Sequence, residues 1–93
     1  MATKTFKIGE YAKGGTIKVT TTKNTINISV INMFGNGEEI DSHQETITEH
    51  DFIKCDSIER RISNFLHDIT TSYYSGKIMA WIKDKTGLKF FWC

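Results

Sequence analysis

Two aromatic residues in the C-terminal third of this 93-residue chain, Trp81 and Phe91, lie among lysines. On an uncovered β-sheet face, an aromatic ring is a stacking platform for a nucleic-acid base, and ammonium groups beside it attract phosphates. The cations expected on that face are Lys7, Lys18, Lys83 and Lys89. Alternatively, both rings form a second small core beneath the acidic segment or the GEYAKGG segment at residues 9–15.

A second group of candidate binding residues has helical spacing. Arg60, Asn64, His67 and Thr71 follow one another at intervals of four, three and four, with Arg61 beside them. In a helix these intervals place side chains along one ridge, where they could contact a groove or a partner protein. A solvated helix face gives the same pattern, so both interpretations stay open.

Metal binding and nucleophilic catalysis have weak support. His43, His50 and Cys55 are residue types that bind zinc, but their spacing matches no familiar ligand pair, and the chain has no CxxC or HExxH motif. Catalysis by Cys55 would need a histidine and a third orienting group, for which His50 and Asp51 are conceivable. A buried structural thiol is the favoured interpretation, so we expect no metal, no cofactor and no catalytic residue.

The formal net charge of +1 conceals a strong segregation of charge along the chain. Residues 1–37 carry a net charge of +4, residues 38–59 carry −7, and residues 60–93 carry +4. If the fold brings the two basic thirds together, the surface is dipolar and can orient a charged partner. Ordinary solvated charge is the alternative.

One long amphipathic helix is predicted over residues 56–74, DSIERRISNFLHDITTSYY. At about 100° per residue, a single apolar arc contains Ile58, Ile62, Phe65, Leu66, Ile69 and Tyr73. Asp56 or Ser57 can cap the first turn, and Gly76 is a stop signal. The preceding Thr48-Glu49-His50-Asp51 resembles a capping box, which predicts a short turn before the main helix.

The remaining segments alternate between polar and apolar residues, as strands do. Strands are predicted at residues 5–8, 16–22, 25–33, 38–47, 77–83 and 88–93. Lys23-Asn24 joins the second and third strands in a hairpin, and the weak, acidic alternation of residues 38–47 indicates an edge strand. A turn at residues 84–87 makes the last two strands a C-terminal hairpin.

The predicted fold is therefore α+β: an antiparallel sheet of five to six strands in the order β-β-β-(β)-α-β-β, with one long helix packed on one face. One helix covers only one side of a sheet, so the other side should face solvent or a partner. The residues expected on this uncovered face are Thr5, Lys7, Lys18, Thr20, Asn27, Ser29, Lys77, Met79, Trp81, Lys83, Lys89 and Phe91.

The length and composition favour one small domain, residues 1–93, with little room for a deep catalytic cleft. No apolar run approaches the roughly 20 residues of a membrane-spanning helix, and residues 1–15 lack the apolar core of a secretory signal. With Cys55 and Cys93 as the two cysteines, we expect a cytoplasmic protein with both thiols reduced.

The opening residues, MATKTFKIGEYAKGG, resemble the start of some small phage anti-CRISPR proteins, and the whole chain is similar to the type I-F inhibitors in size and α+β layout. This resemblance implies stoichiometric binding to the RNA-guided Cascade (Csy) surveillance complex, which stops target DNA from hybridising with the guide RNA. It also implies action in the cytoplasm of an infected bacterium. Some members of the family contact Cas subunits alone, and others also touch the guide RNA.

The resemblance and the residue pattern together predict a non-enzymatic binding protein. Lys7, Lys18 and Arg60 would face RNA phosphates or an acidic Cas surface, the acidic middle would meet a lysine-rich DNA channel, and the C-terminal aromatic residues would be desolvated anchors. The expected partner-binding residues are Lys7, Lys18, Arg60, Asn64, His67, Trp81, Lys83, Lys89, Phe91 and Trp92. Two alternatives remain: a small single-stranded nucleic-acid-binding protein, and a small hydrolase or metal-dependent nuclease.

Overall fold

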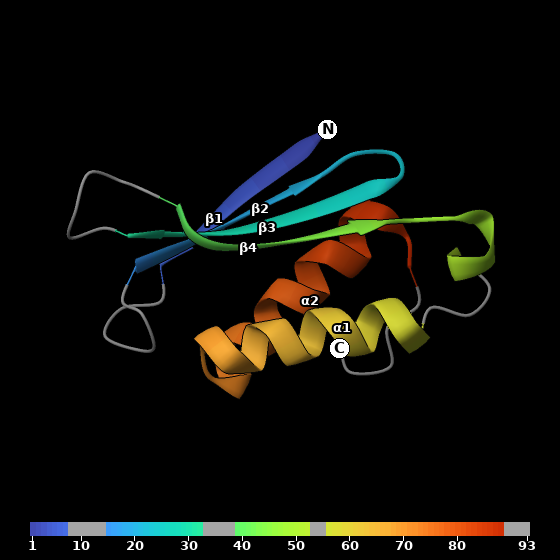
Figure 1. The fold of residues 1–93 in the computed structure, drawn as a ribbon. Helices are drawn as coiled ribbons and strands as arrows, with labels where there is room; N and C mark the ends of the chain where they lie inside the picture. Colours follow the sequence, from blue (N-terminus) through green and yellow to red (C-terminus); the bar gives the residue numbers. More distant parts are fainter. Residues whose placement is uncertain (8–14, 33–38, 53–55, 89–93) are drawn as a thin grey trace.

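The protein is an antiparallel sheet with two helices packed on one of its faces (Figure 1). The structure, a computed structural model, describes residues 1–7, 15–32, 39–52 and 56–88. The α+β class is confirmed, but the predicted count of elements is wrong for these residues. They contain four strands and two α-helices where five to six strands and one long helix were expected.

The sheet is a simple meander with the strand order β1-β2-β3-β4, and all neighbours are antiparallel. The strands are β1 (Ala2–Lys7), β2 (Gly15–Thr21), β3 (Thr25–Asn32) and β4 (Glu39–Thr46). The β2–β3 hairpin is confirmed, and so is the acidic edge strand β4. Strand β1, the other edge, begins three residues before the predicted start at Thr5.

Strand pairing places the apolar residues of β2 and β3 on the same face. Ile17 pairs with Val30, Val19 with Ile28, and Thr21 with Ile26. All six side chains are buried, as the alternation of these strands predicts. This face of the sheet is therefore the floor of the hydrophobic core.

Helix α1 (Asp56–Ile69) buries the predicted apolar arc, with Ile58, Ile62, Leu66 and Ile69 in the core. It ends five residues before the predicted end at Tyr74, because the chain leaves the helix at Thr70 and Thr71. Thr71 is extended (φ −88°, ψ 168°) and is the N-cap residue of helix α2 (Ser72–Thr86). Threonine and serine favour helix ends over helix interiors, which accounts for the break at Thr70-Thr71-Ser72.

Ahead of α1, the predicted capping box forms in part. A short 3-10 helix, η1 (Glu49–Phe52), follows Thr48, whose backbone N–H donates to the Asp51 carboxylate over 2.7 Å. The Thr48 hydroxyl also donates to this carboxylate (2.9 Å), and the Asp51 backbone N–H donates to the Thr48 carbonyl oxygen (3.0 Å), where a capping box would use the Thr48 side chain. The expectation of a short turn followed by the main helix is confirmed.

The predicted strand at residues 77–83 is wrong, since this segment lies within α2. Ile78, Met79 and Ile82 are buried with Ser75, which is the spacing of one helix face. Gly76, predicted to end the first helix, lies inside the second, and the predicted turn at residues 84–87 is the end of α2 with Gly87 as its C-cap. Of the predicted last strand, residues 89–93 lie outside the described residues, and Leu88 is buried in the core.

Each helix covers its own half of the sheet. Helix α2 contacts β2, and α1 contacts β4, on the same face (Figure 1). Neither helix of the described residues lies on the opposite face. In the described part of the chain, no helix is long and apolar enough to span a membrane.

Gly76 and Gly87 provide a matched test of the α2 boundaries, because neither position has an atom within 4 Å of an added Cβ. We expect Gly76→Ala to stabilise the protein by about 0.5–1 kcal/mol, since alanine is the better residue in a helix interior. Gly87→Ala should destabilise it by about 1–2 kcal/mol, because Gly87 has a left-handed φ of 79°. Urea unfolding measures both changes, and stabilisation by Gly87→Ala would contradict the assigned C-cap.

Candidate functional site

The uncovered face of the sheet is polar and carries two of the predicted binding residues. Lys18 on β2 pairs with Thr5 and Ser29, and Lys7 on β1 pairs with Thr16, so both lysines project from the face opposite the helices. Both are exposed. Thr20 and Asn27 extend the same face, as predicted. The face therefore offers ammonium, hydroxyl and amide groups to a polar partner.

The residues predicted on this face from the C-terminal third lie elsewhere. Lys77, Met79, Trp81 and Lys83 belong to α2, on the other side of the sheet. Met79 is buried, and Trp81 packs edge-on against Phe6 of β1 with ring centroids 6.4 Å apart. Trp81 is partly buried and, like Phe6, packs against the main core, so the interpretation of Trp81 as a core residue is the better one. Among the described residues, the core that it joins is the main core and not a second one.

The ridge of α1 is present with three of its four residues. Arg60, Asn64 and His67 are exposed on α1, whereas Thr71 is the N-cap residue of α2. The described candidates thus lie on three surfaces: the sheet face, the α1 ridge and α2, where Lys83 is exposed. Lys89, Phe91 and Trp92 lie outside the described residues.

The fold divides the charges between two halves of the molecule. In the described ranges, β1, β2, the β2–β3 turn and α2 carry seven lysines and one carboxylate: Lys4, Lys7, Lys18, Lys23, Lys77, Lys83, Lys85 and Asp84. The elements β4, η1 and α1 carry eight carboxylates and two arginines: Glu39, Asp41, Glu45, Glu49, Asp51, Asp56, Glu59, Asp68, Arg60 and Arg61. Strand β3, between the halves, has no charged residue. We call these the basic half and the acidic half.

This division follows from the packing of the helices. The first basic third of the chain forms β1 and β2, and α2 packs on β2, so the two basic segments meet. Acidic β4 and α1 pack together at the other edge. The dipolar arrangement predicted from the segregation of charge is thus present among the described residues.

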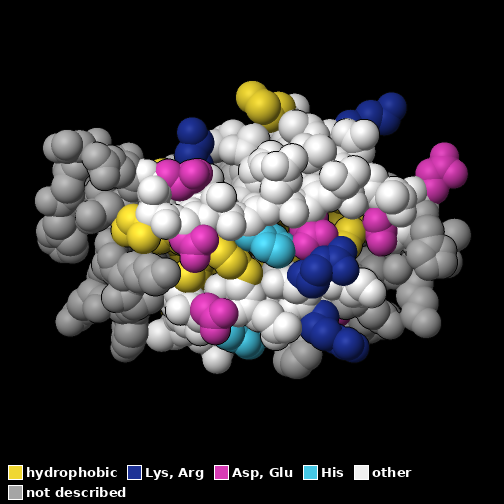
Figure 2. Space-filling view, in the orientation of Figure 1, with side chains coloured by type: hydrophobic (Ala, Val, Ile, Leu, Met, Phe, Trp, Pro, Cys, Tyr) yellow, Lys and Arg dark blue, Asp and Glu magenta, His cyan; other side chains and the backbone are white. Residues whose placement is uncertain are grey.

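A polar network joins β4 to α1, and no pattern in the sequence predicted it. The Arg61 guanidinium donates two hydrogen bonds to the Glu45 carboxylate (2.8 and 2.9 Å), although Glu45 is only 7% exposed. His43 lies 2.7 Å from the same carboxylate and stacks on Phe65 with ring centroids 5.2 Å apart. Figure 2 shows a histidine between acidic and basic side chains at the centre of this face.

The network keeps Glu45 ionised in a largely buried place. Burial raises the pKa of Glu45, but the hydrogen bonds from Arg61 and His43 outweigh it, so the pKa lies below its ordinary value. Glu45 and Arg61 are 16 residues apart, and no local spacing would have revealed their pairing. This network of Glu45, Arg61 and His43 fixes the edge strand β4 to α1, and we call it the clamp.

The described residues hold no group of three or more histidine, cysteine, aspartate or glutamate side chains that could bind a metal ion. His43 is used in the network with Glu45. Cys55 lies outside the described residues, so the proposed zinc and cysteine-nucleophile sites cannot be built from the described residues.

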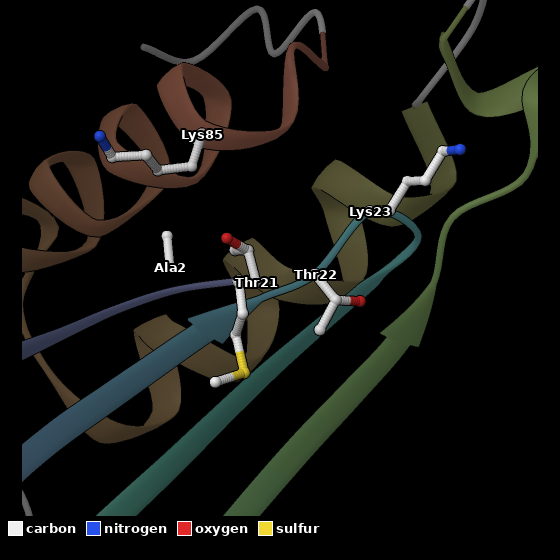
Figure 3. Close-up of a pocket in the computed structure, with 6 residues that line it drawn as sticks. Ala2, Thr21, Thr22, Lys23 and Lys85 are labelled. Atoms are coloured by element: carbon white, nitrogen blue, oxygen red, sulfur yellow. The ribbon is translucent and has the colours of Figure 1, made fainter.

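An open hollow of about 320 Å³ lies where the N-terminus passes the β2–β3 turn and the end of α2. Its lining residues are Met1, Ala2, Thr21, Thr22, Lys23 and Lys85. Figure 3 shows the Lys23 and Lys85 side chains pointing in different directions. Without convergent polar groups, this hollow does not resemble a small-molecule site.

Because the clamp contains an ionised Glu45, the free energy of unfolding should fall at acidic pH. Because the folded pKa of Glu45 is lowered, its contribution is fully present above the pKa of the unfolded chain and is lost as pH falls through the folded pKa. Unfolding free energy measured by urea at a series of acidic pH values should fall less for Glu45→Gln than for the natural protein. Equal pH dependence of both proteins would contradict an ionised, paired Glu45.

Arg60 and Arg61 are adjacent on α1, so their alanine variants are a matched test of how much the clamp contributes to stability. Arg61→Ala should cost about 1–3 kcal/mol by leaving a buried carboxylate poorly paired, with the lower end favoured because Arg61 is 53% exposed. Arg60→Ala, at an exposed position, should change stability by no more than about 0.5 kcal/mol. Similar losses for both variants would show that the clamp contributes nothing specific.

Comparisons with known proteins do not assign this chain to a family. No protein-family model, curated protein or solved structure matches it.

Proposed function

We propose that this protein is an anti-CRISPR inhibitor, which binds an RNA-guided Cas surveillance complex of the Csy type stoichiometrically and blocks the binding of target DNA. The observation that carries the proposal is the division of the described charges into a basic and an acidic half. A surveillance complex presents both signs of charge, on its RNA backbone and on the lysine-rich path of the target DNA. A small protein with both signs can be oriented by such a partner.

The basic half would face RNA phosphates or an acidic Cas surface. Lys7 and Lys18 project from an uncovered sheet face whose threonine, serine and asparagine side chains can donate hydrogen bonds to phosphate oxygens. This face is built from strands that the core holds in place, so binding needs no folding of the described residues. Lys7 and Lys18 would contribute mainly through direct contacts with phosphate or carboxylate oxygens at this face, and these contacts weaken as salt rises.

The acidic half would compete with DNA for a cationic channel. Its carboxylates lie on β4, η1 and α1, and Arg61 neutralises mainly the buried Glu45. Glu39, Glu49 and Asp68 are exposed and available to lysines of a partner. On the α1 ridge, Arg60, Asn64 and His67 would add polar contacts at the margin of this surface.

A single-stranded nucleic-acid-binding protein is the alternative, and the position of Trp81 weakens it. That function needs aromatic rings beside the lysines on one open face, and Trp81 lies against Phe6 on the helix side. Lys7 and Lys18 alone favour attraction of phosphates without stacking of bases. The hydrolase or nuclease alternative has no supporting cluster among the described residues.

A DNA-loading assay tests the proposal. Purified Csy complex is incubated with increasing amounts of the protein, labelled target duplex is added, and bound DNA is measured by a mobility shift. We expect DNA binding to disappear as the protein becomes equimolar with its binding sites, without turnover. If DNA loading is unaffected at saturating protein while free RNA is bound with a steep salt dependence, the inhibitor proposal is wrong and the alternative holds.

Charge reversal on the sheet face tests the surface itself. Lys7→Glu with Lys18→Glu should weaken inhibition roughly tenfold, which corresponds to about 1.4 kcal/mol. The matched control, Lys23→Glu with Lys85→Glu, changes the net charge equally but alters the β2–β3 turn and α2. It should weaken inhibition less than about threefold, because net charge alone steers only weakly in salt. Equal effects of the two double variants would remove the sheet face from the proposal.

A further inference from the structure

The two edges of the sheet are oppositely charged. Strand β1 presents Lys4 and Lys7 and has no acidic residue, whereas β4 presents Glu39 and Asp41 and has no lysine or arginine. In the described part of the chain, each of these strands pairs with one neighbour only, so each has an unpaired edge. Such an edge carries backbone N–H and C=O groups that can pair with another strand.

Strand direction makes the two edges compatible. The sheet is an antiparallel meander of four strands, so β1 and β4 run in opposite directions. A second copy shifted sideways past β4, and turned only enough to continue the twist of the sheet, would place its β1 antiparallel to the first copy's β4. Because both helices lie on one face of the sheet (Figure 1), the helices of both copies would then lie on the same side of one continuous sheet.

We infer that the protein associates with itself in this way, through pairing of β1 of one copy with β4 of the next. Lys4 and Lys7 would lie beside Glu39 and Asp41 of the neighbouring copy, at the roughly 5 Å spacing of adjacent strands. The association uses the backbone edges of β1 and β4, and Lys7 is the one lysine that it shares with the sheet face of the proposed function.

Charge selects this pairing over the other edge pairings. Two β1 edges would bring lysines together, and two β4 edges would bring carboxylates together, which is destabilising in cross-strand pairs. The helices reinforce the choice, since acidic α1 of one copy would neighbour basic α2 of the next. Only the β1-to-β4 contact brings opposite charges together both in the sheet and in the helix layer.

The contact is heterologous, and this fixes the form of the assembly. It joins two different surfaces, so each added copy leaves one basic and one acidic edge free. The average mass should therefore rise continuously with protein concentration and pass beyond that of a dimer. Salt should oppose the association, because both edges are exposed to solvent.

Sedimentation velocity on the full chain tests this inference. At an ionic strength of about 0.01 M, where the Debye length is about 30 Å, the weight-average mass should rise about twofold or more with concentration. At about 1 M, where it is about 3 Å, the protein should sediment as a monomer. A monomer at every concentration in low salt would overturn the inference, and so would association that salt leaves unchanged.

Charge-swapped variants identify the edges. Lys4→Glu with Lys7→Glu makes both edges acidic, and Glu39→Lys with Asp41→Lys makes both basic, so each variant alone should be monomeric. An equimolar mixture of the two variants should associate again, because every contact then joins an acidic edge to a basic edge. Failure of the mixture to associate, with both variants folded by circular dichroism, would overturn the inference.

A control with the same change of net charge separates the edge from the overall charge. Lys18→Glu with Lys23→Glu alters the face of β2 and the β2–β3 turn and leaves both edges intact. This variant should associate within about twofold of the natural protein's affinity. Loss of association in this control to the same extent as in Lys4→Glu with Lys7→Glu would show that the edges do not direct assembly.

Discussion

Two helices bury one face of the sheet, and this burial determines where the strands, the helices and their charges lie. The inward residues of β2 and β3 form an apolar floor, and α1 and α2 cover it from one side. Because each helix adds about 10 Å of width, two helices side by side are needed to cover about four strands. In the described part of the chain, the same arrangement leaves the other face without a helix and sorts the charges into two halves, since each helix carries the sign of the strand beneath it.

The edge strand β4 shows how the fold accommodates charge next to its core. Glu45 points to the helix side, where an unpaired carboxylate would be costly, and Arg61 reaches it from α1 with two hydrogen bonds. His43 and Phe65 complete the contact by stacking. At the opposite edge, Phe6 and Trp81 join β1 to α2 through apolar contact. The two edges are thus fixed to their helices by different chemistry, polar in the acidic half and aromatic in the basic half.

The β2–β3 hairpin could be predicted from the sequence because both strands alternate strictly and a clear turn joins them, whereas β4 was recognised from a weak, acidic alternation. Helix α2 could not, because residues 77–83 are few, and their apolar positions fit a strand with Ile78 and Ile82 on one face as well as a helix. That single error placed Trp81 and Lys83 on the sheet face, whereas both belong to the helix layer. Lys7 and Lys18 were placed on the correct face because strands β1 and β2 were predicted correctly. The Glu45–Arg61 pair was missed because the two residues are brought together only by the tertiary fold.

The fold separates a basic half from an acidic half, and we propose that the two halves bind partners of opposite charge. Amide chemical-shift mapping measures this, with polyphosphate as the anionic probe and oligolysine as the cationic probe. Polyphosphate should shift amides of β1, β2 and α2, whereas oligolysine should shift amides of β4, η1 and α1. Shifts of the same amides by both probes would contradict it.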